Sequence, residues 1–169
     1  GGLFRGRVIN SPEGLLVRPT GARTREAVFN ILQDVSGFSV LDLFSGSGIM
    51  GIEAISRGAS SVVAVENNRK QAISLRNNYR KLQIENNLTL WERDVLSLEF
   101  SHEKKTFDLI YADPPFTETY PDLRKFLDFL SPDGVAIFEC PSRAIPEWAL
   151  EGKVRRYGES SLAFFWKDS

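Results

Sequence analysis

The sequence predicts an α/β fold built on a doubly wound, Rossmann-like sheet, and three features of the chain support this. Short apolar runs typical of buried strands recur after residue 37 and alternate with segments of helical period. A glycine-rich turn joins the first of these runs to a helix. Two strand-like runs around a Gly-containing turn close the chain, which adds an antiparallel hairpin strand to a parallel sheet. At 169 residues, the chain fits a single domain.

Residues 1–36 are expected to form a small N-terminal extension, a hairpin followed by a helix. Residues 3–9 alternate apolar and basic side chains, which is a strand pattern, and residues 15–17 supply a hairpin partner. Across residues 22–35 the apolar side chains recur with the period of an amphipathic helix, and Thr20 is the expected N-cap.

Residues 37–169 are expected to form the sheet and its covering helices. Apolar runs predict strands at residues 40–44, 62–65, 88–91, 107–111 and 135–138. Segments of helical period predict helices at residues 49–56, 69–82 and 120–130. The closing hairpin is predicted at residues 154–157 and 162–166. Because strand–helix alternation gives parallel units with right-handed crossovers, we expect helices on both faces of the sheet.

Composition excludes several classes of protein. With 42% hydrophobic and 25% charged residues, most of the chain is not expected to be disordered. No apolar run approaches the roughly 18–20 residues that cross a bilayer, and no signal peptide is visible, so we expect a cytoplasmic protein with no membrane partner. A single cysteine, Cys140, and a single histidine, His102, argue against an internal disulfide, a bound metal and a Ser-His-Asp triad.

Basic residues are unevenly distributed on a chain whose net charge is −1. The first 30 residues hold two acidic residues and five arginines: Arg5, Arg7, Arg18, Arg23 and Arg25. Residues 67–81 hold five basic residues and no acidic one. Such segregation can build a phosphate-facing surface on a nearly neutral protein. A solvated helix face explains the second cluster equally well, whereas the all-arginine first cluster favours phosphate binding.

The glycine-rich turn indicates a nucleoside-containing cofactor. Gly46, Gly48 and Gly51 form a G-x-G-x-x-G pattern between a predicted strand and a predicted helix, where glycines permit a tight turn and close approach of a ligand. Glu66 ends the next strand, 20 residues after Gly46, where a carboxylate can accept hydrogen bonds from a ribose diol. We therefore expect the cofactor at the carboxyl ends of the strands.

Asp42 favours S-adenosylmethionine over a dinucleotide. This carboxylate stands on the strand just before the glycine turn, where it would repel a pyrophosphate and attract an ammonium or sulfonium group. Asp94, after the third predicted strand, is a candidate acceptor for the adenine amino group. Its alternative role is to cap the turn that follows it.

The four residues Asp113, Pro114, Pro115 and Phe116 follow the fourth predicted strand. A strand-exit turn explains one proline but not two followed by an aromatic residue. The Asp113 carboxylate and the Pro114 carbonyl can each accept one N–H of a planar exocyclic amine, which aims the nitrogen lone pair at a methyl donor. Phe116 offers a face on which the base can stack. This motif therefore predicts transfer of a group to a nucleobase amine.

These motifs resemble those of the S-adenosylmethionine-dependent amino-methyltransferases of class I fold. The resemblance rests on residues 41–48 (LDLFSGSG) together with residues 113–116 (DPPF). More narrowly, residues 18–30 (RPTGARTREAVFN) are similar to the N-terminal signature of the RsmD family, whose bacterial members methylate N2 of one guanine in 16S ribosomal RNA. Further matches to that family are FRGR at residues 4–7, GIEA at residues 51–54 and YG at residues 157–158.

The resemblance implies roles for individual positions. The cofactor would contact Asp42, Phe44, Gly46, Gly48 and Gly51 with its methionine part, Glu66 with its ribose, and Asn67, Asp94 and Val95 with its adenine. The target guanine would bind Asp113, Pro114, Pro115 and Phe116. The RNA backbone would be held by Arg5, Arg7, Arg18, Arg23 and Arg25.

The implied partner is 16S rRNA, free, in an assembly intermediate or in the 30S subunit, and the protein is expected to be a monomer. Three alternatives remain open. One is a protein glutamine methyltransferase, although such enzymes usually begin the four-residue motif with Asn and this chain begins it with Asp113. A DNA adenine or cytosine amino-methyltransferase would use the same four residues after the fourth strand, although little of the chain is left for a DNA target-recognition domain. A non-catalytic RNA-binding module would share the fold without the reaction.

Overall fold

The computed structural model describes residues 21–99, 105–115 and 119–168, which form one seven-stranded sheet. The strand order is β3-β2-β1-β4-β5-β7-β6. The strands are β1 (Ser39–Leu43), β2 (Ser61–Val65), β3 (Leu88–Trp91), β4 (Phe107–Ala112), β5 (Leu130–Pro141), β6 (Lys153–Tyr157) and β7 (Ser160–Trp166). The strands β1 to β5 run parallel to one another, and β7 is antiparallel to both β5 and β6. The predicted doubly wound α/β fold and its closing hairpin are confirmed.

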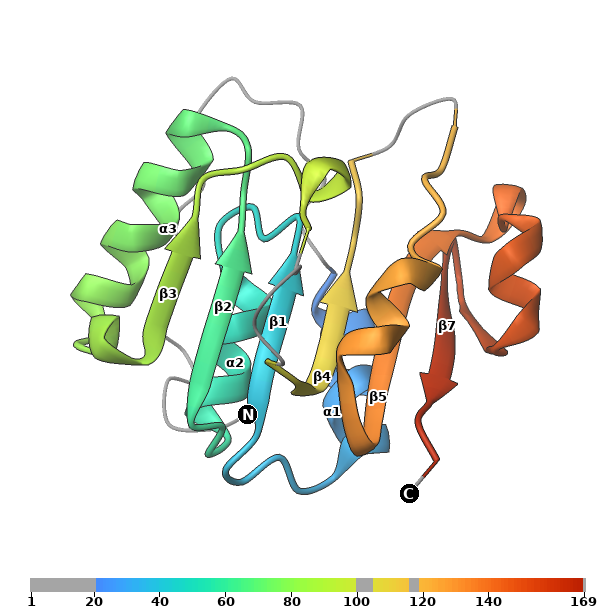
Figure 1. The fold of residues 1–169 in the computed structure, drawn as a ribbon, viewed down its shortest axis with the longest axis horizontal. Helices are drawn as coiled ribbons and strands as arrows, with labels where there is room; N and C mark the ends of the chain where they lie inside the picture. The colour runs from blue at the N-terminus through green and yellow to red at the C-terminus, as the bar shows by residue number, and fades with distance from the viewer. Residues whose placement is uncertain (1–20, 100–104, 116–118, 169) are drawn as a thin grey trace.

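Each face of the sheet is covered by a different kind of helix (Figure 1). The helices α1 (Ala22–Leu32), α2 (Ile49–Ser56) and α3 (Arg69–Lys81) share one apolar core with the sheet. The opposite face is covered by the 3-10 segments η2 (Val95–Ser97), η3 (Arg124–Phe129) and η5 (Glu147–Glu151). Helices on both faces were predicted, but on the second face they are 3-10 turns.

The helix predicted at residues 120–130 is wrong. Only the six residues of η3 are helical, and they are of the 3-10 type. The Asp122 carboxylate accepts hydrogen bonds from the backbone N–H of Arg124, and β5 already begins at Leu130. A 3-10 helix rises about 2.0 Å per residue against 1.5 Å for an α-helix, so it spans more of the sheet with the few residues available.

The strand predicted at residues 135–138 is longer than expected, because β5 starts at Leu130. Its register against β4 shifts between Phe107 and Leu109, so that the turn residues 131–134 are accommodated as an irregularity within the strand. The Ser131 hydroxyl donates to the Asp108 carboxylate at 2.6 Å and stabilises this irregularity. The Pro-Asp-Gly sequence at residues 132–134 is typical of a turn, and the irregular pairing of β5 with β4 accommodates it within the strand.

Other predicted boundaries differ by a few residues. The first helix ends at Leu32 rather than at residue 35, because Gln33 takes a positive φ of 61°. Its N-cap is Gly21 rather than Thr20. The helix predicted at residues 49–56 matches α2.

Several predicted features lie outside the described residues: the N-terminal hairpin, His102, Arg5, Arg7, Arg18 and Phe116. Among the residues that are described, no helix combines the length and the apolar character needed to cross a membrane.

Candidate functional site

The predicted cofactor residues meet at the carboxyl edge of the parallel strands, on β1 and β2. After β1 the chain turns sharply: Phe44, Gly46 and Gly48 all have positive φ, at 55°, 57° and 86°. Phe44 is strained in this conformation, since it carries a side chain. The Ser45 N–H donates to the carbonyl of Val65 at the end of β2, which ties this glycine loop (residues 44–48) to the neighbouring strand.

Two glycines of the loop region are required by the packing of α3. A Cβ on Gly48 would lie 2.8 Å from Cγ of Leu75. A Cβ on Gly51 would overlap the Tyr79 hydroxyl and lie 2.9 Å from Cγ1 of Val62. Any side chain at these positions would push α3 away from the loop. At Gly51 the absence of a side chain also lets α2 pack closely against Val62 of β2.

α3 also fixes the glycine loop by hydrogen bonding. The Asn78 side chain, 3% exposed, donates through Nδ2 to the carbonyl of Ser47 at 3.0 Å. The helix itself begins at a cap in which Asn68 Oδ1 accepts from the N–H of Gln71 at 3.0 Å. Sequence reasoning missed Asn78, because a polar residue inside a helix gives no signal of which face it occupies.

Glu66 links the glycine loop to the start of α3. Its Oε1 accepts from the Gly46 N–H at 2.7 Å, and its Oε2 accepts from the Asn68 N–H at 2.9 Å. A carboxylate oxygen has two lone pairs, so each oxygen keeps the capacity for one further hydrogen bond. Glu66, which is predicted to bind the ribose, therefore also fixes the conformation of the glycine loop. Asn67 beside it is exposed.

Asp42 is a buried carboxyl group directly beneath this loop. It is 2% exposed, and its Oδ2 has no hydrogen-bond partner among the described residues. Burial raises the pKa of Asp42 to about 7, and repulsion by Glu66 adds to this, while hydrogen bonding from Ser45 and from the Gly51 N–H opposes it. The group is therefore close to half-charged near neutral pH, and a nearby cation would favour its charged form.

Tyr79 on α3 brings a second buried polar group to the same place. Its side chain is fully buried, its hydroxyl lies against Gly51, and that hydroxyl has no hydrogen-bond partner among the described residues. Burial and the negative charge of Asp42 raise the pKa of Tyr79 well above its usual value. Two buried polar atoms, Asp42 Oδ2 and the Tyr79 hydroxyl, have no hydrogen-bond partner among the described residues, so this region is costly to fold, which is typical of functional sites.

The edge of β3 supplies the predicted adenine contacts. Asp94 caps η2, where its Oδ1 accepts from the Leu96 N–H at 3.0 Å. The capping role considered from the sequence is thus observed, and Asp94 remains exposed with acceptor capacity for a ligand. Val95, which follows it, is buried in the core on the 3-10 face.

The predicted substrate residues follow β4, which pairs with β1. Asp113 and Pro114 are half-buried and Pro115 is exposed. Because Leu43 of β1 is paired with Ala112 of β4, Asp113 leaves the sheet beside the start of the glycine loop. The structure therefore brings the predicted substrate and cofactor segments to adjacent strand ends.

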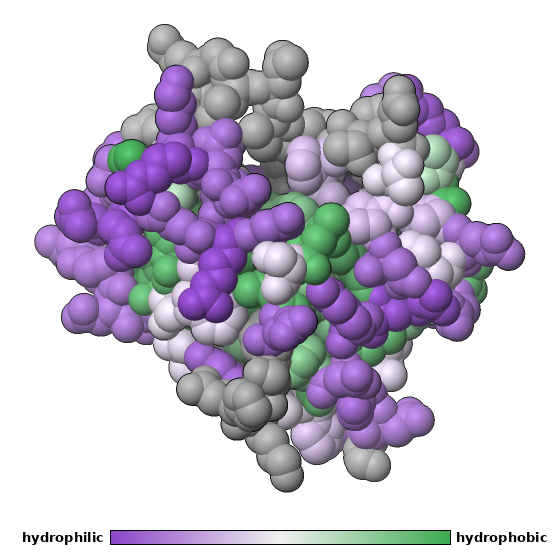
Figure 2. Space-filling model, turned by 45° about the horizontal axis from the view of Figure 1, so that its top comes forward, coloured by the Kyte–Doolittle hydropathy of each residue, from purple (hydrophilic) through white to green (hydrophobic). Residues whose placement is uncertain are grey.

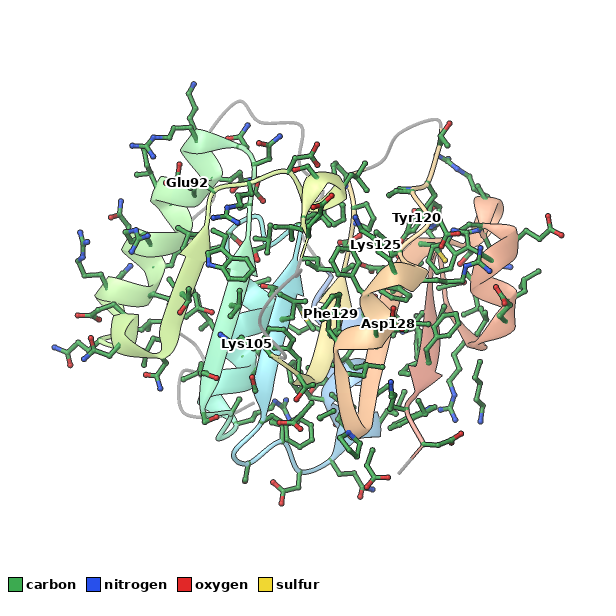
Figure 3. All side chains as sticks on the ribbon, viewed as in Figure 1. Glu92, Lys105, Tyr120, Lys125, Asp128 and Phe129 are labelled. Carbon is green, nitrogen blue, oxygen red and sulfur yellow. The ribbon has the colours of Figure 1, made fainter. Side chains whose placement is uncertain are left out.

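Behind Asp113 lies a set of polar groups that sequence reasoning missed. Glu139 of β5 is 1% exposed and accepts a hydrogen bond from the Tyr111 hydroxyl at 3.2 Å. The Tyr120 hydroxyl donates to the Glu139 carbonyl at 2.6 Å, and Figure 3 shows Tyr120 on the chain that precedes η3. Burial, with the charges of Glu139 and Asp113, raises the pKa of the Cys140 thiol to about 11. The sequence did offer one signal for these groups, because Glu139 stands within an otherwise apolar strand.

Of the predicted RNA-binding arginines, Arg23 and Arg25 are described. Arg23 is exposed on α1. The Arg25 side chain is 19% exposed, with Nε 3.8 Å from Oε1 of Glu53, a residue that also binds Arg57 at 3.2 Å. Arg25 thus lies between α1 and α2, where it joins the N-terminal helix to the core.

A hollow of about 630 Å³ lies elsewhere, beside η3 and η5. Its lining residues are Arg124, Glu147, Trp148, Leu150 and Glu151. None of the predicted cofactor or substrate residues lines it.

Comparison with known proteins identifies the family. The model of the family described as conserved hypothetical protein 95 matches residues 1–166. Ribosomal RNA small subunit methyltransferase D of Haemophilus influenzae is 38% identical over 125 residues, which cover 68% of this chain and 61% of that protein. The Escherichia coli K12 protein of the same name is 35% identical over 118 residues, covering 69% of this chain and 58% of that protein. The matched part thus spans about three fifths of these curated relatives.

Solved structures agree with this result. The Escherichia coli protein yhhF is 26% identical, has a TM-score of 0.81, and is matched over 99% of this chain and 96% of that one. The Thermus thermophilus 16S rRNA N2 G1207 methyltransferase (RsmC), in complex with AdoMet and guanosine, is 25% identical with a TM-score of 0.75, over 92% of this chain and 44% of that one. The fold is therefore that of the class I methyltransferases, and the chain belongs to the RsmD family, the family described as conserved hypothetical protein 95.

Proposed function

We propose that the protein transfers a methyl group from S-adenosyl-L-methionine to the exocyclic N2 amine of a guanine in 16S rRNA. The observation that carries this is the meeting of two segments at one sheet edge: the glycine loop above buried Asp42, and Asp113-Pro114 on the adjacent strand. Relatives named as ribosomal RNA small subunit methyltransferases, and a similar structure that holds AdoMet and guanosine, support this assignment.

The residues at the edge of β1 and β2 fit S-adenosylmethionine. Its methionine part carries an ammonium group, and Asp42 offers a buried carboxylate oxygen without a partner among the described residues. Its ribose needs hydrogen-bond acceptors, which Glu66 retains, and its adenine can be held by Asn67, Asp94 and Val95. Phe44, Gly46, Gly48 and Gly51 shape the backbone around it. When bound, the cofactor supplies a methyl group activated on a sulfonium.

The residues after β4 then orient the amine and accept its proton. The Asp113 carboxylate and the Pro114 carbonyl each accept one N–H, which turns the nitrogen lone pair away from the ring. Asp113 offsets the positive charge that develops on nitrogen and can take the proton that leaves. Positioning of this kind is worth up to about 7–11 kcal/mol of the barrier. Pro115 keeps the loop rigid, and Phe116 is proposed to stack on the base.

The RNA partner is proposed to be 16S rRNA in the 30S subunit or an assembly intermediate. Arg5, Arg7, Arg18, Arg23 and Arg25 are proposed to contact its backbone, with Arg25 doing so only at the junction of α1 and α2. Since rRNA is the substrate, the protein would act in the cytoplasm, and it would act as a monomer.

The experiment that tests this function is transfer of labelled methyl from S-adenosylmethionine to 30S particles and to 16S rRNA, followed by nucleoside analysis. We expect N2-methylguanosine at a single site. Transfer to DNA instead would keep the fold and cofactor and replace the substrate with that of a DNA amino-methyltransferase. RNA binding with no transfer to any substrate would establish the non-catalytic alternative.

A further inference from the structure

The exposed side of α3 carries positive charge that the proposed reaction does not use. Lys70, Arg76, Arg80 and Lys81 are exposed along the helix, and we call these four residues the α3 basic face. Residues 67–81 contain no acidic residue. Figure 2 shows hydrophilic side chains over the side of the molecule where α3 lies.

The four cations of the α3 basic face have no ion pair within the part of the chain that the structure describes, unlike several arginines elsewhere. By contrast, Arg57 binds Glu53 at 3.2 Å. Arg69, the first residue of the same helix, binds Glu92 at 2.6 Å, and Figure 3 labels Glu92 beside the start of α3. The α3 basic face is therefore available to an anion from outside the protein.

Helix geometry aligns these charges. Lys70 and Lys81 are eleven residues apart, or about 16 Å along the axis. Arg76 and Arg80 share one stripe with Ile73, which is 48% exposed, while Lys70 and Lys81 lie on the stripe beside it. The opposite side of the helix is fixed by its contacts with the glycine loop, so both stripes face outward.

The position of α3 relates the charges to the candidate site. The helix starts directly after Asn68, whose N–H is bonded to Glu66 at the cofactor edge, and runs back along the outer side of β2 and β3. An RNA whose target base reaches the end of β4 would therefore meet this helix only with parts of its backbone beyond the target nucleotide.

We propose that the α3 basic face binds the phosphate backbone of the RNA substrate, away from the methylated base. This inference rests on the proposed function, and it adds a second contact region to that of the N-terminal arginines. Four exposed cations with no ion pair among the described residues, beside one exposed apolar side chain, fit the charge of phosphates and the apolar side of a ribose. It lacks the wide apolar face with which an amphipathic helix enters a membrane surface.

The test compares two variants with the same change of charge. One replaces part of the α3 basic face (Arg76→Gln, Arg80→Gln and Lys81→Gln), leaving Lys70 near the cofactor edge in place. The control replaces three exposed cations at the opposite edge of the sheet, on β6 and after β7: Lys153→Gln, Arg155→Gln and Lys167→Gln. The dissociation constant for 16S rRNA is measured across a series of salt concentrations, with S-adenosylhomocysteine binding and thermal unfolding as checks on folding.

We expect the α3 variant to bind RNA at least tenfold more weakly at about 0.1 M salt, with a salt slope shallower by about 2, because three phosphate contacts are lost. The control variant should bind within about threefold of wild type, and both should retain cofactor binding. Equal affinities and slopes for wild type and the α3 variant would overturn the inference, as would equal losses in the two variants. If the wild-type protein methylates rRNA and the α3 variant binds rRNA with the same affinity as the wild type, only this inference fails. If wild-type protein does not bind rRNA, the proposed function fails with it.

Discussion

The two segments that meet at the carboxyl edge are held in different ways. The glycine loop after β1 is fixed by its surroundings: Glu66 accepts from the Gly46 N–H, Asn78 donates to the Ser47 carbonyl, and the Ser45 N–H binds β2. The segment after β4 is stiffened by covalent geometry, because Pro114 and Pro115 have fixed φ and no N–H to bind elsewhere.

This difference shows where each half of the site is sensitive. The cofactor half depends on side chains contributed by β1, β2 and α3, several of them buried and polar, so changes there should alter folding and ligand affinity together. The substrate half is held mainly by the fixed geometry of its two prolines, so a change at Asp113 should alter the reaction while the fold and cofactor binding persist.

The largest effect is expected from Asp113→Ala. Loss of the acceptor for the amine N–H should reduce methyl transfer about 100-fold or more, measured as label incorporated into 30S particles. S-adenosylhomocysteine affinity, measured by calorimetry, should stay within about twofold, because the cofactor half is unchanged. Exposed Asp128→Ala is the control. Loss of cofactor binding in Asp113→Ala would show that the two halves are not independent.

Asp42→Asn should separate function from stability within the cofactor half. We expect cofactor affinity to fall at least tenfold, about 1.4 kcal/mol or more, since the cofactor ammonium loses its charged partner. At pH 8 the free energy of unfolding should rise by on the order of 1–4 kcal/mol, since the amide has no charge to keep out of water. Denaturant titration with and without ligand measures both effects. A variant that is less stable at pH 8 would contradict this.

The raised pKa of Asp42 also fixes the direction of a pH dependence. In the unfolded chain the group ionises near pH 4, whereas in the folded protein it retains its proton to about pH 7. Between these values the folded state binds more protons, so its stability should fall as pH rises from about 4 to 7 and then level off. The Asp42→Asn variant should lack this decline, so the wild-type curve minus the variant curve should fall between about pH 4 and 7. A difference that rises with pH would contradict the assignment.

A smaller effect is expected from Gly51→Ala, which should destabilise the fold by about 1–3 kcal/mol because the new methyl overlaps the Tyr79 hydroxyl. The double variant Gly51→Ala/Tyr79→Phe removes that hydroxyl and should recover part of the loss, leaving the contact with Val62. Unfolding of the two single variants and the double variant gives the coupling energy. No coupling would mean that Tyr79 does not set the distance between α3 and the loop.

The smallest effect is expected from Glu66→Gln. An amide has only one acceptor oxygen, so one of the two N–H groups bound by Glu66 loses its partner, at a cost of about 1–2 kcal/mol in unfolding. Cofactor affinity should fall as well, whereas Glu92→Gln at the exposed pair with Arg69 should change neither. Equal behaviour of the two variants would limit Glu66 to a surface role.

Residue pattern alone predicted the strands, α2 and α3, because buried strands and amphipathic helices leave periodic apolar signals. It also located the glycine loop, Glu66 and Asp113. Glycines and carboxylates that directly follow a predicted strand can be recognised from the sequence once the strand itself is predicted. It was wrong at residues 120–130, where only residues 124–129 are helical and the helix is of the 3-10 type.

What the sequence determined by itself was the order of the elements and the chemistry offered at the ends of β1, β2 and β4. What only the tertiary structure decided was which side chains from distant segments support that edge. Asn78 reaches Ser47, Tyr79 reaches Gly51, and Glu139 reaches Tyr111 across gaps of about 30 residues in the chain. The physical reason is that burial and hydrogen-bond partners depend on how strands and helices pack, which no local pattern of residues encodes.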